Sequence, residues 1–352
     1  MQFGLFGSAA ARRPTADDDA DFDCSEGYRD FIDYNVEAEA LGFRSTFVVE
    51  HHFTGYGQVS ATLNLLTWLG ARTRRLRLGT AVIVLPWHNP VLLAEQAATL
   101  DLLSGGRLDF GVGKGYRYNE FAGFCVDMDE ADARFDECLA VIVKAWTSNE
   151  KFSHRGRYWQ FDEIVVEPPT AQRPHPPIWM GAGGESSVRR VAERGYNLLL
   201  GQYASAADVG RSIAAYRAGV EASGQRFNPL SVGVTRAFFV ADGEAEKEAA
   251  LERRLANRVR QLKLATRLDG TVHGGPDRAT GDPDVVNRAS AMYGSPDDIA
   301  EKLDELRSVG VGYVLINGGG SGGGARGRAS LNRFAAEVMP HFAEESPARA
   351  AE

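Results

Sequence analysis

The sequence has few cysteines and no long apolar run, and both absences narrow the classes of protein that it can encode. Its 352 residues include three cysteines, Cys24, Cys125 and Cys138, which are odd in number and not closely paired. This pattern argues against a disulfide framework and against a zinc knuckle, and we interpret it as the sign of a reducing, cytoplasmic setting. The sequence also has no apolar stretch of about 20 residues, which a helix needs to span a bilayer.

An excess of positive charge and a secretion signal are missing as well. The net charge is −8, so neither nucleic acid nor a membrane surface is expected as a partner. The apolar amino terminus, 1–7, is too short for the core of a signal peptide, and the basic residues Arg12 and Arg13 lie on its wrong side. With 44% hydrophobic and 24% charged residues, the chain has the composition of a globular protein with a large core.

What the chain does have is a regular alternation of short apolar runs and amphipathic stretches. Eight runs have the pattern of strands: Gln2–Phe6, Thr46–Val49, Leu76–Val84, Leu108–Val112, Ile178–Met180, Leu198–Leu200, Leu230–Val240 and Tyr313–Ile316. Eight stretches have helical spacing: Tyr28–Leu41, Ala61–Gly70, Val91–Leu103, Asp132–Trp146, Ser186–Arg194, Ala206–Ala222, Asp297–Ser308 and Leu331–Phe342. This alternation predicts an α/β protein with the (β/α)8 architecture of a TIM barrel, rather than an open doubly wound sheet with its glycine-rich first turn.

Two segments interrupt the alternation and predict insertions after strands four and seven. Segment 151–177 alternates aromatic and polar residues and then turns proline-rich, which predicts a hairpin. Segment 243–293 has a charged, helical first half and a second half rich in glycine, aspartate and proline. We interpret it as a mobile lid over the barrel mouth, with a disordered insert as the alternative. We therefore expect one domain over 1–345 and a disordered tail over 346–352.

Polar side chains follow the second predicted strand at the point where it ends. Glu50, His51, His52 and Phe53 come directly after the apolar run 45–49. The carboxyl ends of parallel strands are where functional side chains collect in α/β proteins. Neighbouring side chains of a strand point to opposite faces, so only one of the two histidines can face inward. A packed histidine beside a solvated one is the structural alternative.

Glycine-rich turns follow the fourth and fifth predicted strands. In Gly111–Gly115, the glycines let backbone N–H groups approach a flat or anionic ligand, although a tight turn explains them equally well. Gly181–Ser187 opens a helix and predicts a phosphate site, with helix capping by a serine as the alternative. Neither turn is a dinucleotide fingerprint or a P-loop. The sequence shows no hydrolase nucleophile elbow and no cluster of metal ligands, so a barrel hydrolase is disfavoured and no metal is expected.

Motifs from about Met1 to Phe342, in this order, resemble the bacterial luciferase-like flavin monooxygenase family. They are Glu50–Thr54, Gly79–Val82, Leu85-Pro86, Asn89-Pro90, Leu103–Arg107, Gly111–Gly115, Glu120-Phe121, Arg134-Phe135, Pro177–Trp179 and Gly294–Pro296. The resemblance implies a (β/α)8 barrel, commonly a homodimer, that binds reduced FMN supplied by a separate reductase. It also implies that O2 adds to the flavin and that the resulting flavin peroxide or hydroperoxide oxidises an apolar organic substrate, such as a ketone, an aldehyde or a polycyclic compound.

The resemblance assigns roles to individual residues. His51 matches the active-site histidine of the family, a general acid/base or a hydrogen-bond donor. The Ala81-Val82 peptide matches a non-prolyl cis bond that supports the flavin ring, and Gln202 falls where the luciferases have a tryptophan close to the flavin. Contacts to the flavin phosphate are implied for Lys114, Gly183, Gly184 and Ser187.

Departures from bacterial luciferase affect the expected substrate. Gly113 replaces a reactive cysteine and would leave more room beside the flavin, while Lys114 replaces an arginine and cannot hold phosphate with a bidentate fork. Together with Gln202, they argue against long-chain aldehydes and light emission. The loop residues expected to form an apolar pocket that excludes water are Phe53, Tyr56, Trp87 and Tyr116. A deazaflavin-dependent dehydrogenase or reductase of the same fold, and a non-catalytic flavin-binding protein, remain the alternatives.

Overall fold

Eight parallel strands close into a barrel in the computed structural model, which describes residues 1–271, 282–318 and 324–343. The barrel strands are β1 (Gln2–Gly7), β2 (Ser45–Val48), β3 (Arg77–Thr80), β5 (Leu108–Gly113), β8 (Ile178–Gly181), β9 (Asn197–Leu200), β10 (Val232–Val240) and β12 (Tyr313–Asn317). Each strand pairs with the next barrel strand along the chain, and the last strand, β12, pairs with β1. The pairing of β9 with β10 completes the ring, so the predicted (β/α)8 barrel is confirmed.

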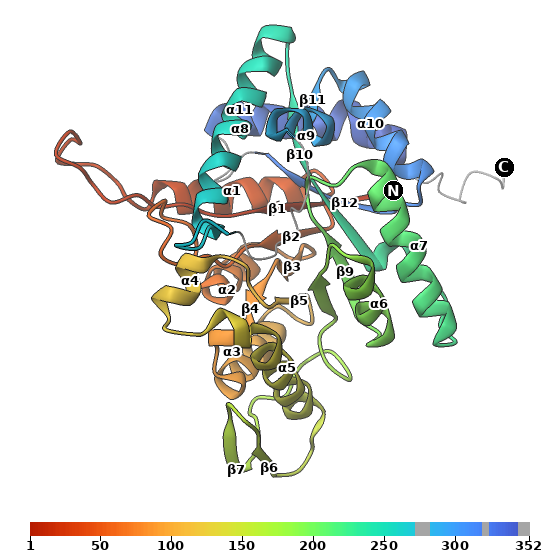
Figure 1. The fold of residues 1–352 in the computed structure, drawn as a ribbon. Coiled ribbons are helices and arrows are strands. Elements are labelled where there is room, and N and C mark those ends of the chain that lie inside the picture. The colour runs from red at the N-terminus through yellow and green to blue at the C-terminus, as the bar shows by residue number, and fades with distance from the viewer. Residues whose placement is uncertain (272–281, 319–323, 344–352) are drawn as a thin grey trace.

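Helices surround this barrel, as Figure 1 shows. They are α1 (Glu26–Ala40), α2 (Thr62–Arg72), α3 (Pro90–Leu103), α5 (Ala131–Thr147), α6 (Glu185–Glu193), α7 (Ala206–Ala222), α10 (Pro296–Ser308) and α11 (Gly324–Arg333). The main core lies between these helices and the outer face of the strands. A second cluster fills the barrel interior with Phe47, Trp179, Leu199, Tyr313 and Leu315. The interior is therefore a packed core, as in other barrels of this type, and not a pore.

The third predicted strand, Leu76–Val84, is not continuous. It divides into β3 and β4 (Ile83–Val84), and the two residues between them, Ala81 and Val82, are joined by a cis peptide bond. β4 pairs with the end of β5, where Val84 lies opposite Gly113. A single strand over this range was therefore a wrong prediction, because the chain changes direction at the cis bond.

Both predicted insertions contain ordered elements. Within 151–177, β6 (Phe152–Arg155) and β7 (Gln160–Ile164) form an antiparallel hairpin that projects from the body at the bottom of Figure 1. Within 243–293 lie α8 (Glu244–Ala265) and α9 (Pro283–Ser290), and the segment ends in β11 (Met292–Gly294), which pairs with β10. Residues 272–281 of this segment and the predicted tail, 346–352, lie outside the described residues.

Two other elements differ from the sequence prediction. A short helix, α4 (Tyr118–Gly123), follows β5 and carries side chains of the site described below. The last predicted helix, Leu331–Phe342, ends as α-helix at Arg333 and continues through a π turn, η4 (Phe334–Val338), and a 3-10 turn, η5 (Met339–Phe342). Pro340 lacks the N–H that a continuing helix would need.

Among the described residues, no helix combines the length and the apolar character needed to cross a bilayer.

Candidate active site

Glu50 is the centre of a hydrogen-bond network at the carboxyl end of β2. Its side chain is buried and accepts hydrogen bonds from Nε2 of His52 at 2.8 Å and Nε2 of His88 at 2.7 Å. It also accepts the backbone N–H of Val84 at 2.8 Å. Burial raises the pKa of Glu50, but the hydrogen bonds from the two histidines and from Val84 outweigh it and bring the pKa to about 2. Glu50 is therefore ionised at neutral pH and holds β4 against the loop that follows β2.

His51 turns away from Glu50, as the alternation of a strand requires. Its Nδ1 lies 2.9 Å from Oε1 of Glu120 on α4, and the same oxygen accepts the backbone N–H of His52 at 3.0 Å. A carboxylate partner places the ring proton of a neutral imidazole on Nδ1, so Nε2 keeps its lone pair. Burial lowers the pKa of His51, and Glu120 opposes that effect only in part. The geometry thus favours a neutral His51 whose Nε2 can accept a proton.

Arg117 adds a buried positive charge behind this pair. One of its terminal nitrogens lies 3.8 Å from Oε1 of Glu120 and donates a hydrogen bond of 3.4 Å to Gln58. The other terminal nitrogen donates to Gln261 on α8. Arg117 lowers the pKa of His51 further, after burial and against the hydrogen bond to Glu120. Neither Arg117 nor Glu120 had been assigned a site role from the sequence, although Glu120-Phe121 was among the motifs that carried the family resemblance.

The cis peptide bond between Ala81 and Val82 lies at the top of the barrel interior. Both residues pack against the interior cluster that contains Phe47 and Trp179. The geometry expected from the resemblance is therefore present at this peptide. The Val82 side chain fills the space above Gly113, because a Cβ atom added there would lie 2.5 Å from Cγ2 of Val82. On this side Gly113 therefore adjoins the Val82 side chain rather than open space.

The turn after β8 leads directly into α6. Gly184 is the N-cap residue, and the Ser187 hydroxyl accepts its N–H at 3.2 Å and donates to its C=O at 2.7 Å. The Ser187 hydroxyl is thus engaged in capping, which was the structural alternative for this motif. Gly183 and Gly184 are exposed, so their backbone can be approached from solvent. Lys114 is bonded to Asp132 on α5 at 2.8 Å rather than to this turn.

Gln202 lies in the loop that follows β9, and basic side chains hold that loop in place. Arg236 on β10 donates to the C=O of Gly201 at 3.3 Å and to that of Ala204 at 2.7 Å. Burial lowers the pKa of Arg236 to about 10, which still leaves it charged at neutral pH. Arg254 and Arg258 of α8 pack on the ring of Tyr203, with their Cζ atoms 4.5 and 4.2 Å from its centroid.

Aromatic side chains surround the outer end of the His51 and His52 loop. Phe53 is 58% exposed and has a positive φ of 53°, and Tyr56 is 40% exposed. Trp87 is stacked on Phe124, with ring centroids 5.2 Å apart. Tyr116 lies beside Arg117, whose Cζ is 5.9 Å from the ring centroid. Of the four predicted pocket residues, Phe53 and Tyr56 thus offer exposed apolar surface, while Trp87 lies partly beneath an aromatic cluster.

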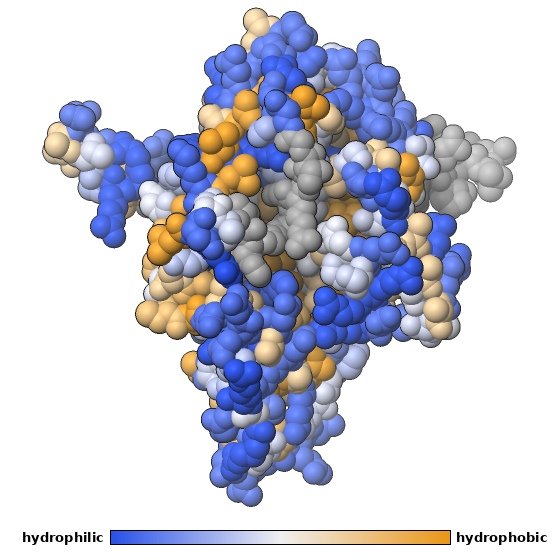
Figure 2. Space-filling view, viewed as in Figure 1, coloured by the Kyte–Doolittle hydropathy of each residue, from blue (hydrophilic) through white to orange (hydrophobic). Residues whose placement is uncertain are grey.

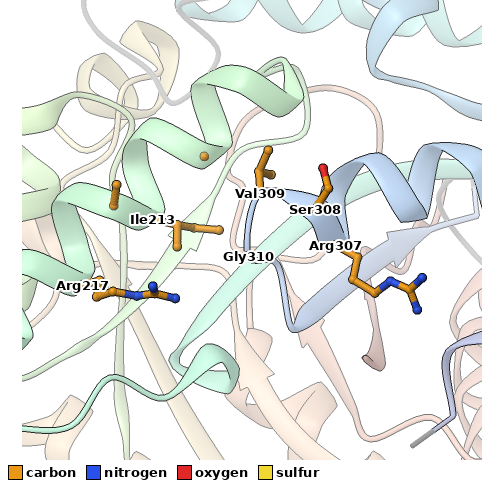
Figure 3. A pocket seen from close by; sticks show the side chains of 8 residues that line it. Ile213, Arg217, Arg307, Ser308, Val309 and Gly310 are labelled. Atoms are coloured by element: carbon orange, nitrogen blue, oxygen red, sulfur yellow. The ribbon is translucent and has the colours of Figure 1, made fainter.

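One surface groove lies away from these residues. It has a volume of about 320 Å³ and is lined by α7 and the end of α10, including Arg217 and Arg307 (Figure 3). Val309 and Gly310 of this groove precede β12, so it belongs to the amino-terminal face of the barrel. Catalytic groups of such barrels gather at the opposite face. No group of three or more metal-ligating side chains occurs in the part of the chain that the structure describes.

The fold and the site together define an α/β-barrel enzyme whose functional side chains lie at the carboxyl ends of its strands. The family of luciferase-like monooxygenases matches residues 1–312, and the chain belongs to that family. It is accordingly a flavin-dependent monooxygenase, an oxidoreductase. The resemblance inferred from the sequence motifs is confirmed.

Characterised relatives share most of the chain. The oxygenase component of a flavin-dependent trigonelline monooxygenase from Acinetobacter baylyi is 25% identical over 334 residues, 90% of each chain. An FMNH2-dependent dimethylsulfone monooxygenase from Pseudomonas putida is 27% identical over 305 residues, 81% of this chain and 82% of the relative. The monooxygenase RslO1 from Streptomyces bottropensis is 27% identical in sequence. Its crystal structure superposes with a TM-score of 0.81 and covers 97% of this chain and all of that one.

The same fold also occurs with a deazaflavin. An F420-dependent secondary alcohol dehydrogenase, solved with an F420–acetone adduct, superposes with a TM-score of 0.74 over 97% of this chain and 99% of that one. Its sequence identity is 15%, so this likeness concerns the fold alone.

Proposed function

We propose that this protein is the oxygenase component of a two-component system. In this proposal a separate reductase supplies reduced FMN, and the enzyme uses it with O2 to oxidise an apolar organic substrate. The observation that carries the proposal is the position of the Val82 side chain at the barrel mouth, between Gly113 at the end of β5 and Gly181 at the end of β8, which leads into the exposed turn of α6. The similarity to relatives described as an oxygenase component and as FMNH2-dependent supports the same reading.

The residues at the mouth fit a flat ring with an anionic tail. β5 pairs with β8, so Val82 and the turn after β8 are neighbours, and a Cβ atom added at Gly181 would lie 3.9 Å from Cγ1 of Val82. The ring would lie on the Ala81–Val82 peptide beside Gly113, and Gln202 would approach it from the loop after β9. The phosphate would lie at the exposed turn of Gly183 and Gly184, directly before the first turn of α6, because the amino end of a helix offers backbone N–H groups and a positive dipole end. Ser187 and Lys114 would complete that site by exchanging their present partners.

FMN, when bound, would be the group that reacts with O2. The side chains around it would control proton transfer and the access of water. His51 accepts a proton at Nε2 while Glu120 orients the ring through Nδ1. Phe53 and Tyr56 would supply exposed apolar surface at the mouth, with Trp87 in the aromatic cluster behind them and Tyr116 beside Arg117. A mouth covered in this way excludes water from the reacting centre.

Deazaflavin-dependent hydride transfer is the competing function, and one experiment separates the two. The protein is titrated under argon with reduced FMN and, separately, with reduced F420, and the FMN complex is then mixed with O2. We expect tight binding of reduced FMN and a rate of flavin reoxidation different from that of free reduced FMN. Binding of F420 without binding of FMN would overturn the proposal in favour of a dehydrogenase or reductase. A panel of ketones, aldehydes and polycyclic compounds with 18O2 then identifies the substrate by mass.

We also propose that the enzyme is a homodimer that works in the cytoplasm. Exposed apolar side chains lie on two adjacent helices, Trp68 on α2 and Leu92 and Leu103 on α3, and these supply a face that a second copy can cover. The three cysteines are free, which suits a reducing compartment.

A further inference from the structure

Helix α8 connects two separate parts of the barrel mouth. Its middle contacts the loop after β9, where Arg254 and Arg258 pack on Tyr203. Its last turns contact the opposite side, where it packs against α4 and Gln261 accepts a hydrogen bond from Arg117. Figure 1 shows this helix running from the top of the view down toward α4.

Arg117 is the side chain that lies between α8 and the active-site histidine. It is 3% exposed, and its Nε has no hydrogen-bond partner among the described residues. Its position therefore depends on its terminal nitrogens, which contact Glu120, Gln58 and Gln261. Glu120 in turn holds Nδ1 of His51 at 2.9 Å. Gln261, Arg117, Glu120 and His51 thus form one continuous chain of polar contacts from α8 to the site.

We propose that Gln261 and Arg117 are positioning residues through which the docking of α8 holds Glu120 and the ring of His51 in place for proton transfer. The consequence for catalysis depends on the function proposed above, whereas the contact itself can be tested without flavin. Two hydrophobic side chains of α8, Val259 and Leu262, are exposed. Figure 2 shows hydrophobic surface on this side of the mouth.

The charges around His51 explain the direction of the effect. Charged and titratable groups face His51 from three elements. Glu50 and His52 belong to its own segment, and Glu120 lies on α4 with Arg117 directly before that helix. Helix α8 contributes Arg260, whose Cζ lies 5.2 Å from the ring centroid of Tyr56. Burial lowers the pKa of His51, and Arg117 lowers it further against the pull of Glu120. If Gln261 is lost as an acceptor, the guanidinium becomes free to turn toward water and the loop becomes better hydrated. Both changes favour the imidazolium form, so the pKa of His51 rises.

The test is an NMR titration of His51 in the full-length protein, labelled with 13C-histidine and free of flavin. The variants are Gln261→Met, Arg117→Met and the double variant, and a His51→Asn sample assigns the signal. Lys263→Met, on the exposed side of the same helix turn, is the matched control. We expect an upward shift of the His51 pKa in both single variants and no change in the control. Because Gln261 acts through Arg117, the double variant should equal Arg117→Met rather than the sum of the two shifts.

Two results would overturn the proposal: an unchanged titration in Gln261→Met, or fully additive shifts in the double variant. Gln261 is half-buried, so Gln261→Met is expected to fold. If Arg117→Met does not fold, the difference in the His51 pKa between Gln261→Met and Lys263→Met still tests the proposal. If His51 responds as expected but reduced FMN does not bind, the coupling holds and the proposed cofactor is wrong. The two failures are therefore distinguishable.

Discussion

The backbone N–H of Val84 donates a hydrogen bond of 2.8 Å to the buried carboxylate of Glu50. This contact joins the loop that carries His51 to the strand that follows the Ala81–Val82 peptide. The proposed proton acceptor and the proposed support of the flavin ring are therefore held relative to one another by a single ionised side chain. Changes at Glu50 should disturb both parts at once.

The first prediction concerns the stability that Glu50 contributes. Replacing Glu50 by Gln leaves an amide that cannot accept the hydrogen bonds of two histidines and Val84 together. The pKa of Glu50 is brought to about 2 from 4.5, so we expect a loss of roughly 3 kcal/mol in the free energy of unfolding at pH 7. Urea denaturation of both proteins measures this difference. Glu252→Gln, on the exposed face of α8, is the control and should unfold like the wild type.

The same pair of proteins tests the pH dependence. Because the folded-state pKa lies below the unfolded value, the contribution of Glu50 is complete above pH 4.5 and is lost as the pH falls toward 2. The stability difference between wild type and Glu50→Gln should therefore narrow over this interval. A difference that stays constant between pH 5 and pH 3 would show that the charge of Glu50 is not what stabilises the network.

The second prediction uses the packing of Val82 against Gly113. A methyl group at residue 113 would lie 2.5 Å from Cγ2 of Val82, whereas one at Gly181 would lie 3.9 Å from Cγ1 of the same side chain. Gly113→Ala should therefore destabilise the protein by about 1–3 kcal/mol and weaken binding of reduced FMN. Gly181→Ala is the matched control for stability, which it should leave unchanged.

A double variant checks the cause. In Gly113→Ala with Val82→Ala, the colliding methyl group is gone, so most of the lost stability should return relative to Val82→Ala alone. Thermal unfolding and fluorescence titration with FMN under reducing conditions measure the two properties. If Gly113→Ala and Gly181→Ala behave alike, Val82 does not occupy the space above Gly113.

The sequence was sufficient for the barrel but not for the contacts within the site. Apolar periodicity located all eight barrel strands, and the family motifs pointed to His51 and to the cis bond between Ala81 and Val82. The contact of Arg117 with Gln261 joins residues 144 positions apart, and no local pattern specifies such a pair. The Val82 side chain packs against Gly113 only because of the direction in which it points after the cis bond. The sequence motif does not specify that direction. β11 was missed because its three residues are too few for a periodic signal.

The third prediction tests the proposed dimer face. Leu103 on α3 is 69% exposed and Leu268 in the 243–293 segment is 92% exposed, so both accept a charge without disturbing the core. Leu103→Glu should shift the protein toward a monomer, because the charge would be buried between two copies of α3. Leu268→Glu should not. Sedimentation velocity of the three proteins decides the matter, and a wild-type monomer at micromolar concentration would remove the dimer proposal.

The last prediction assigns the proton chemistry to Nε2 of His51. Asparagine at residue 51 can place its amide N–H near the position of Nδ1 and so still donate to Glu120, but it has no group where Nε2 lies. His51→Asn should therefore bind reduced FMN as the wild type does while the rate of product formation falls by about 10²- to 10⁴-fold. Burial lowers the pKa of His51 below its usual value of 6.5. The wild-type rate should therefore be constant near neutral pH. It should fall as the pH drops through the lowered pKa, because protonation of Nε2 removes the proton acceptor. The variant should lack this acidic limb. Rates measured between pH 5 and pH 8 test both statements, and an acidic limb that persists in His51→Asn would assign the titrating group to another residue.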